Sequence, residues 1–214
     1  VMSYGDLAGE VKIYSTAPQS RDCTQSEYLL KLADAARWSE RYGCRGILID
    51  AGDNLCEPWI LASVVLQNTT TLRPLVTIQP GSLPPFSAAK TIATYAFLYR
   101  RQLSVRMLAD DDRQESADRL IEYTTVLKQF LECEGTVTFE GQYYSITDQE
   151  FAPPLPATLM PEILIDAEHE AARNITATLV VTPQFDAASP DASPVGSPGL
   201  SANGAGCGIH LGVF

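Results

Sequence analysis

Cys56 is one of few side chains in this sequence whose type suits chemistry, and it follows the apolar run Gly46–Asp50 closely. A cysteine reacts as the thiolate, which a neighbouring histidine or another cation must favour. The chain has two histidines, His169 and His210, and neither is close to Cys56 in the sequence. Two interpretations of Cys56 therefore stay open: a catalytic thiol at the edge of a site, or a small buried side chain.

Arg106 places a positive charge inside the apolar run Leu103–Leu108. Such a side chain must face a partner, a cavity or solvent, because burying an isolated charge is costly. If Arg106 faces a cavity, its guanidinium can hold a phosphate or a sulfonate with two hydrogen bonds. If it faces a neighbour, it forms an ion pair with a carboxylate on a modified edge of the sheet. Both interpretations stay open here.

The adjacent carboxylates Asp110–Asp112 are the other concentration of polar groups. Adjacent carboxylates rarely converge on one ion, and Asp112 followed by Glu115 is instead typical of a helix N-cap. Two histidines in the whole chain support neither a zinc site nor a Ser-His-Asp triad. We therefore predict no metal.

Composition narrows the class of protein. The 45% hydrophobic residues are enough to form a core, and a length of 214 residues suggests one domain or at most two. The formal net charge is −11. An acidic chain repels phosphates, so we expect no nucleic-acid partner. There is no apolar run of about 18 residues, so we expect no membrane span. The absence of a signal-like start and of CxxC spacing among five cysteines favours a cytoplasmic location with reduced thiols.

Up to Thr182, short β-branched runs alternate with longer stretches of helical periodicity. We predict parallel strands at Val11–Tyr14, Gly46–Asp50, Leu75–Ile78, Leu103–Leu108, Ile163–Ile165 and Leu179–Val181. We predict helices at Ser26–Tyr42, Glu57–Gln67, Ser87–Tyr99, Arg113–Glu132 and Glu168–Arg173. Glu140-Gly141, between Thr136–Phe139 and Gln142–Ile146, indicates a hairpin.

This alternation predicts an α/β fold, an incomplete or remodelled (β/α) barrel of the TIM type with a β-hairpin insertion. A complete barrel of this type has eight strands and about 250 residues, whereas six parallel strands are predicted here. The alternative is an open, doubly wound sheet.

Several separately spaced motifs resemble the luciferase-like flavin monooxygenases, and most of all their alkanesulfonate monooxygenase branch. The resemblance runs in order from about Val11 to Val181. The matching stretches are Arg45–Ile49, Cys56–Trp59, Leu72–Val76, Gln79–Gly81, Pro80–Pro84, Ala88–Lys90, Phe139–Tyr144 and Met160–Ile163.

The resemblance implies a (β/α) barrel that binds reduced FMN, supplied by a separate flavin reductase, and uses it to oxygenate a small-molecule substrate. It makes Cys56 the catalytic candidate and places Gln79, Arg106 and Asp166 at cofactor-binding positions. The family has arginine, asparagine and the first residue of a Gly-Gly-Ser segment at these three positions, respectively. The glycines that help to hold the flavin phosphate are thus replaced by Asp166-Ala167-Glu168.

Two functions follow from these matches and replacements. The first is a luciferase-like flavin-dependent monooxygenase, and the alternative is a degenerate, non-catalytic homologue that acts as a binding or scaffold protein. An incomplete barrel exposes strand edges and apolar helix faces, so we expect a homodimer or a partner chain.

The composition changes at Pro183. Alanine, serine, glycine and proline make up 19 of residues 183–214, a content too poor in apolar side chains for an independent core. We predict a shortened barrel domain at 1–182 followed by a disordered or linker tail at 183–214.

Overall fold

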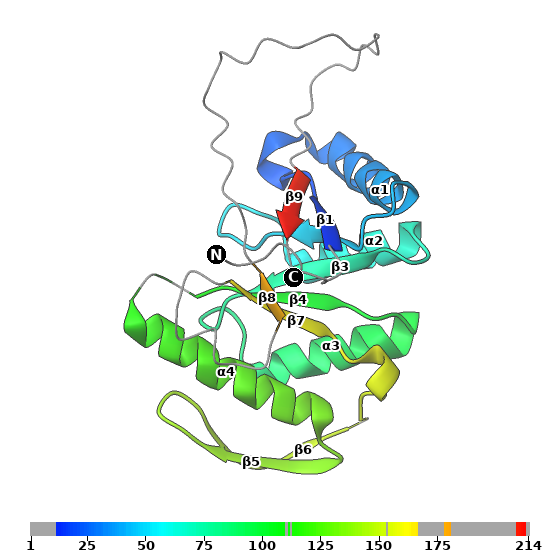
Figure 1. Cartoon of the computed structure of the whole chain (residues 1–214). Helices are drawn as coiled ribbons and strands as arrows, with labels where there is room; N and C mark the ends of the chain where they lie inside the picture. The colour runs from blue at the N-terminus through cyan, green and yellow to red at the C-terminus, as the bar shows by residue number, and fades with distance from the viewer. Residues whose placement is uncertain are drawn as a thin grey trace, which may run out of the picture.

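Six parallel strands lie side by side in one sheet, in the same order as they occur in the chain (Figure 1). This computed structural model describes residues 12–109, 111, 113–152, 154–166, 178–180 and 209–212. The sheet order is β8-β7-β4-β3-β2-β1-β9, and only β9 is antiparallel to its neighbour. The parallel strands are β1 (Lys12–Thr16), β2 (Gly46–Ile49), β3 (Arg73–Ile78), β4 (Ser104–Met107), β7 (Glu162–Asp166) and β8 (Thr178–Val180).

Four long helices connect these strands: α1 (Gln25–Arg41), α2 (Pro58–Asn68), α3 (Pro85–Tyr99) and α4 (Gln114–Glu132). Short 3₁₀ helices lie at Ser20–Asp22 and Ala157–Leu159. Pro58 is the first residue of α2, where its missing N–H costs nothing. None of the helices within the described ranges is both long and apolar enough to cross a membrane.

All four helices pack on one face of the sheet. The register places Ile49 opposite Val76, Val76 opposite Val105 and Val105 opposite Ile163, so these four side chains point to the same side. Ile49 and Val76 belong to the core with α1 and α2, whereas Val105 and Ile163 belong to the core with α3 and α4.

A doubly wound sheet reverses its strand order and carries helices on both faces. Sequential order with helices on one face is instead the arrangement of a (β/α) barrel. The chain therefore forms a curled parallel half-barrel, which confirms the predicted incomplete barrel and excludes the open sheet.

The opposite, inner face of the sheet carries polar groups at both ends of the strands and an apolar layer between them. The apolar layer is a cluster of four buried side chains: Tyr14, Leu48, Leu75 and Leu164. Gly46 lies beside this layer. A Cβ at this position would meet the carbonyl oxygen of Arg73 at 2.3 Å and the ring of Tyr14 at 2.8 Å. Only glycine lets β1, β2 and β3 approach this closely.

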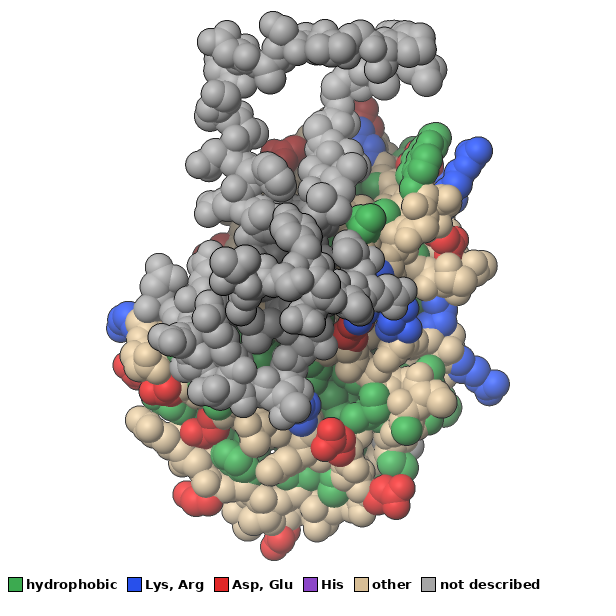
Figure 2. Space-filling view, in the orientation of Figure 1, with side chains coloured by type: hydrophobic (Ala, Val, Ile, Leu, Met, Phe, Trp, Pro, Cys, Tyr) green, Lys and Arg blue, Asp and Glu red, His purple; other side chains and the backbone are tan. Residues whose placement is uncertain are grey.

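The predicted hairpin is confirmed as β5 (Gly135–Glu140) and β6 (Ser145–Phe151). Its second strand begins three residues later than predicted and extends to Phe151. It lies against α4 on the side away from the sheet (Figure 1), where Val137 and Phe151 join the core. The Glu122 carboxylate of α4 accepts hydrogen bonds from the backbone N–H groups of residues 142–144 and fixes the turn. Figure 2 shows Asp and Glu side chains spread over this α4–hairpin region.

Two local predictions need correction or extension. The N-cap of α4 is Arg113 and not Asp112, which lies outside the described residues. Instead, the Asp111 carboxylate accepts hydrogen bonds from the Arg113 N–H and the Ser116 hydroxyl. The predicted helix Glu168–Arg173 lies outside the described residues. Within 183–214 the described residues form β9 (Ile209–Gly212), an unexpected strand that pairs with β1.

Candidate active site

A cavity of about 290 Å³ lies where β2 and β3 end. The carboxyl ends of parallel strands lie at the same edge of a sheet, and in (β/α) barrels the loops at this edge carry the active site. The wall is built from residues 51–53 and 55–57, between β2 and α2, from residues 58 and 59 at the start of α2, and from residues 77–79, 82 and 83. Cys56 and Gln79, predicted separately from the sequence, both line this cavity.

Cys56 is exposed, which rules out the buried-packing interpretation. Its backbone N–H donates a hydrogen bond to the Ser20 hydroxyl at 2.9 Å, which ties the β2–α2 loop to the β1–α1 loop. Burial raises the pKa of Tyr28 to about 12, and the nearby thiol groups of Cys56 and Cys23 add to the rise. The exposed thiol of Cys56 lies in the cavity at the carboxyl ends of the strands, where a ligand can reach it.

The wall of the cavity combines apolar and hydrogen-bonding groups. Leu55, Trp59 and Leu83 are its larger apolar side chains, and Trp59 also packs against both helix-side cores. The Gln79 carbonyl accepts hydrogen bonds from the Ser82 N–H and hydroxyl at 3.0 and 2.8 Å. This tight turn fixes the loop after β3 and holds Gln79 at the rim.

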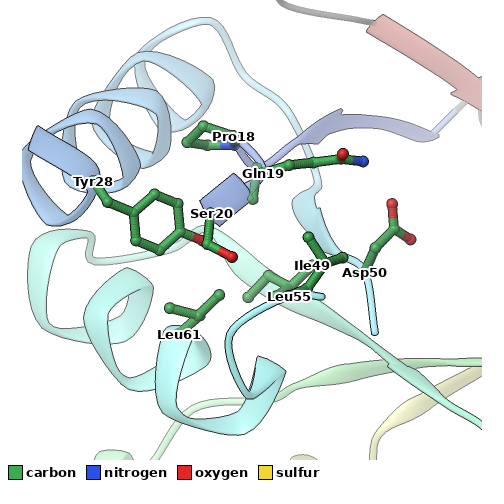
Figure 3. Close-up of a pocket in the computed structure, with 9 residues that line it drawn as sticks. Pro18, Gln19, Ser20, Tyr28, Ile49, Asp50, Leu55 and Leu61 are labelled. Atoms are coloured by element: carbon green, nitrogen blue, oxygen red, sulfur yellow. The ribbon is translucent and has the colours of Figure 1, made fainter. Parts of the chain in front are cut away.

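Leu55 also separates this cavity from a second, very small one of about 10 Å³ between the first two strands and their helices. Figure 3 shows Tyr28, Ser20, Leu55 and Leu61 converging on the small cavity, while the Asp50 carboxylate points away from the Tyr28 ring. The small cavity has room for about one water molecule, so of these two neighbouring cavities only the larger can hold a ligand.

Arg106 lies beside the larger cavity and is engaged by a carboxylate. Its Nη1 lies 3.4 Å from Asp50 Oδ1, and the two side chains are 16% and 32% exposed, respectively. Thr77, between them on β3, places its hydroxyl 3.5 Å from the same carboxylate oxygen. The structure therefore shows the ion-pair alternative for Arg106, on an internal strand and not at an edge of the sheet.

Asp166 is the last residue of β7, two strands away from β3, and its side chain lies outside the described part of the chain. The structure thus brings Cys56 and Gln79 together, places Arg106 next to them, and puts Asp166 at the same edge of the sheet. Its cofactor-binding role stays a prediction.

Sequence reasoning missed Asp50, the partner of Arg106, and the carboxylates Asp53 and Glu57 in the cavity wall. Asp50 is the last residue of a predicted strand, and Asp53 and Glu57 follow it closely, so their position at the carboxyl end of the strand was the available signal.

The amino ends of the strands carry a different charge cluster. The Glu162 carboxylate, 11% exposed, forms an ion pair with Lys12 and lies 3.8 Å from Arg45 Nε and 3.7 Å from Arg73 Nη1. It also accepts a hydrogen bond from the Tyr14 hydroxyl at 3.2 Å. Burial and the Glu162 charge raise the pKa of Tyr14 to about 12. Cations therefore gather at the end of the half-barrel away from the cavity.

Comparison with known proteins identifies relatives of this half-barrel. The 4-(gamma-L-glutamylamino)butanoyl-[BtrI acyl-carrier protein] monooxygenase BtrO of Niallia circulans is 30% identical over 159 residues, which are 68% of this chain and 47% of BtrO. The EDTA monooxygenase EmoA from Chelativorans sp. BNC1 has the same fold, with a TM-score of 0.66 at 11% identity over 77% of this chain and 53% of EmoA. These matches point to the luciferase-like monooxygenases as the relatives of this half-barrel.

Its luciferase-like neighbours include a flavin enzyme. The riboflavin lyase RcaE, solved with modified FMN and riboflavin, gives a TM-score of 0.61 at 14% identity over 77% of this chain and 52% of RcaE. The chain spans about half the length of the relatives it matches. No protein-family model matches it, and its place in the alkanesulfonate branch stays a prediction from the motifs.

The cavity fits the ring of a flavin cofactor but not its phosphate. Leu55, Trp59 and Leu83 suit the flat ring, and the Gln79 side chain can donate or accept hydrogen bonds at its edge. A phosphate needs cations or backbone N–H groups from glycine-rich turns. The described residues of the lining include Asp53 and Glu57 and no lysine, arginine or histidine. The described wall therefore suits the ring, and none of its side chains would hold the phosphate.

Proposed function

We propose that this chain is a luciferase-like flavin-dependent monooxygenase that uses reduced FMN from a separate flavin reductase. The observation that carries the proposal is the cavity at the carboxyl ends of β2 and β3, in a chain related to monooxygenases. In such an enzyme the reduced flavin supplies oxygen activation, and the protein supplies binding, orientation and exclusion of water.

The proposed roles follow from the wall of the cavity. Leu55, Trp59 and Leu83 exclude water and pack against the ring and the substrate. Gln79 orients the ring by hydrogen bonding, and the exposed thiol of Cys56 contacts the reacting molecules. Arg106 is ion-paired with Asp50, so it can bind an anionic group of a ligand only if that group replaces Asp50 as its partner.

The test is a titration of the purified chain with oxidised and reduced FMN, followed by absorbance and protein fluorescence. We expect binding of the reduced form and, with oxygen and a reductase present, transfer of one oxygen atom to a bound substrate. No binding of either form at high micromolar concentration would contradict the proposal.

The ion pair of Arg106 with Asp50 supports the second candidate function, a non-catalytic homologue that binds a partner or a small molecule. In this case a cation that could hold phosphate is already neutralised by the protein. The same titration separates the two functions, since this candidate predicts no oxygen transfer.

We also propose that a second chain, either another copy or a different partner, covers part of the helix surface. Ile60 on α2 and Phe97 and Leu98 on α3 are large apolar side chains that are 66%, 72% and 65% exposed, respectively. Exposed apolar groups of this size are typical of association surfaces when they cluster. Light scattering of the purified chain measures the oligomeric state, and a monomer at micromolar concentration would contradict a homodimer.

A further inference from the structure

The cavity of the candidate active site has an unbalanced charge. Asp53 and Glu57 line it and are exposed, and neither forms an ion pair with any residue in the described ranges. Among the described residues that line it, none is basic. Two full negative charges therefore face any molecule that enters from the mouth.

The positive charges near the cavity are either partial or already paired with a carboxylate. Arg106 lies next to the cavity but has Asp50 as its partner at 3.4 Å, so that pair adds little net charge. The amino ends of α2 and α3 also lie at this edge of the sheet. A helix amino end carries roughly half a positive charge, which two carboxylates outweigh. The field in the cavity is negative.

The other groups of the wall match the same kind of ligand. The wall also contains the indole of Trp59, an aromatic ring of the kind that attracts cations, and Leu55 and Leu83 offer apolar contact. Carboxylates beside an aromatic face are a recurrent way to bind an ammonium group on a hydrocarbon chain. A sulfonate or a phosphate would instead lose its hydration and meet like charges.

From this chemistry we infer that the cavity takes a substrate that carries a positive charge, such as an amine on a carbon chain, and rejects anionic substrates. The inference rests on the proposed function, because it treats the cavity as the substrate site. It departs from the sulfonate substrate implied by the motif resemblance.

The fluorescence of Trp59 can report ligand binding in the cavity, because the chain has only two tryptophans and the other, Trp38, is exposed on α1. In Trp38→Phe protein, the fluorescence of Trp59 reports the cavity alone. We would titrate this protein, without flavin, with hexylamine, hexan-1-ol and hexane-1-sulfonate at neutral pH and low salt. Hexylamine is protonated under these conditions.

We expect hexylammonium to bind about tenfold or more tightly than hexanesulfonate, and this preference to shrink as salt is added. The double substitution Asp53→Asn/Glu57→Gln should remove most of the preference. It breaks no side-chain capping bond of α2. Asp34→Asn is the matched control, because Asp34 is an exposed carboxylate on α1 that pairs with Arg37.

Equal or tighter binding of the sulfonate, no binding of any probe, or a preference that survives the double substitution would each overturn the inference. Flavin binding is measured separately on the same protein. A chain that prefers hexylammonium but binds no flavin loses the proposed function alone, and a chain that binds flavin but prefers hexanesulfonate loses this inference alone.

Discussion

Asp50 and Arg106 form an ion pair across an intervening strand, with Asp50 Oδ1 3.4 Å from Arg106 Nη1 and Thr77 of β3 between them. Asp50 follows β2 and Arg106 belongs to β4, so the pair links the ends of two strands that are not direct neighbours. It also sets how much positive charge the mouth of the half-barrel can offer to a ligand.

Removing the Asp50 charge should release Arg106 for anions. We expect Asp50→Asn to raise the affinity for FMN relative to riboflavin by about three- to tenfold, since these flavins differ by the phosphate. Arg106→Ala should abolish any preference for FMN. Fluorescence titration with both flavins measures the ratio, and an unchanged ratio in both variants would remove Arg106 from ligand binding.

The exposed thiol of Cys56 should react with iodoacetamide before the partly buried Cys23, Cys44 and Cys133. Since Cys56 lines the cavity, its alkylation should block flavin binding. Peptide mass spectrometry locates the label. Cys56→Ser protein treated in the same way is the control and should still bind flavin, so equal loss of binding in both proteins would place the damage elsewhere.

Gly46→Ala should destabilise the fold by about 2–4 kcal/mol, because the new methyl group must displace the Arg73 carbonyl or the Tyr14 ring. Gly52→Ala is the matched control. Its Cβ would meet only Leu55 at an ordinary 3.6 Å. Urea unfolding followed by circular dichroism compares the two variants, and similar midpoints would show that the strands can move apart at Gly46.

Glu40 links α1 to the residues before β3, with its carboxylate accepting hydrogen bonds from the backbone N–H groups of Thr70 and Leu72 at 2.8 and 3.1 Å. Burial raises the pKa of Glu40, but hydrogen bonds from Thr71, Leu72 and Thr70 outweigh it and lower this pKa to about 2, below the ordinary 4.5.

A lowered folded-state pKa stabilises the protein above the unfolded pKa, and this contribution disappears as pH falls from 4.5 towards 2. Glu40→Gln should therefore lower stability at pH 7 by about 1–2 kcal/mol and flatten the acid limb of the stability curve. Unfolding midpoints measured from pH 7 to pH 2.5 test this, with Asp34→Asn as control. Parallel curves for Glu40→Gln and wild type would exclude the carboxylate as the cause.

Glu162 holds three cations at the amino ends of the strands. Glu162→Gln leaves these cations to repel one another, so we expect a loss of about 2–4 kcal/mol. Glu27→Gln, which removes the exposed pair with Lys31, should change stability far less, because solvent screens that pair. Unfolding at low and high salt provides the measurement: salt should relieve part of the Glu162→Gln defect, and a salt-independent loss would indicate a packing effect.

The sequence pattern predicted the β-α units because their apolar periodicity is local. The helices around Leu32 and Leu127 and the strands around Leu48 and Val105 all form within a few residues of the predicted positions. The barrel type followed from the same alternation together with the family motifs.

The partner of Arg106 was not predictable in the same way. It depends on the register of β2, β3 and β4, which places two residues 56 positions apart side by side. The strand Ile209–Gly212 was missed for a related reason: its pairing with β1 is non-local, and its neighbours in the sequence are glycine- and serine-rich. Side-chain type pointed to Cys56 and the family motifs pointed to Gln79, but the carboxylates that set the charge of the cavity look like ordinary loop residues in the sequence.

The antiparallel strand β9 has a consequence for assembly. Tyr14 pairs with Gly46 of β2 on one side and with His210 of β9 on the other, so β1 has no unpaired edge along this stretch. Any strand that extends the sheet on this side, from this chain or from another, must dock beside β9 or compete with it for the same backbone groups of β1. Completion of the barrel at β1 is therefore an exchange of strands and not a simple addition.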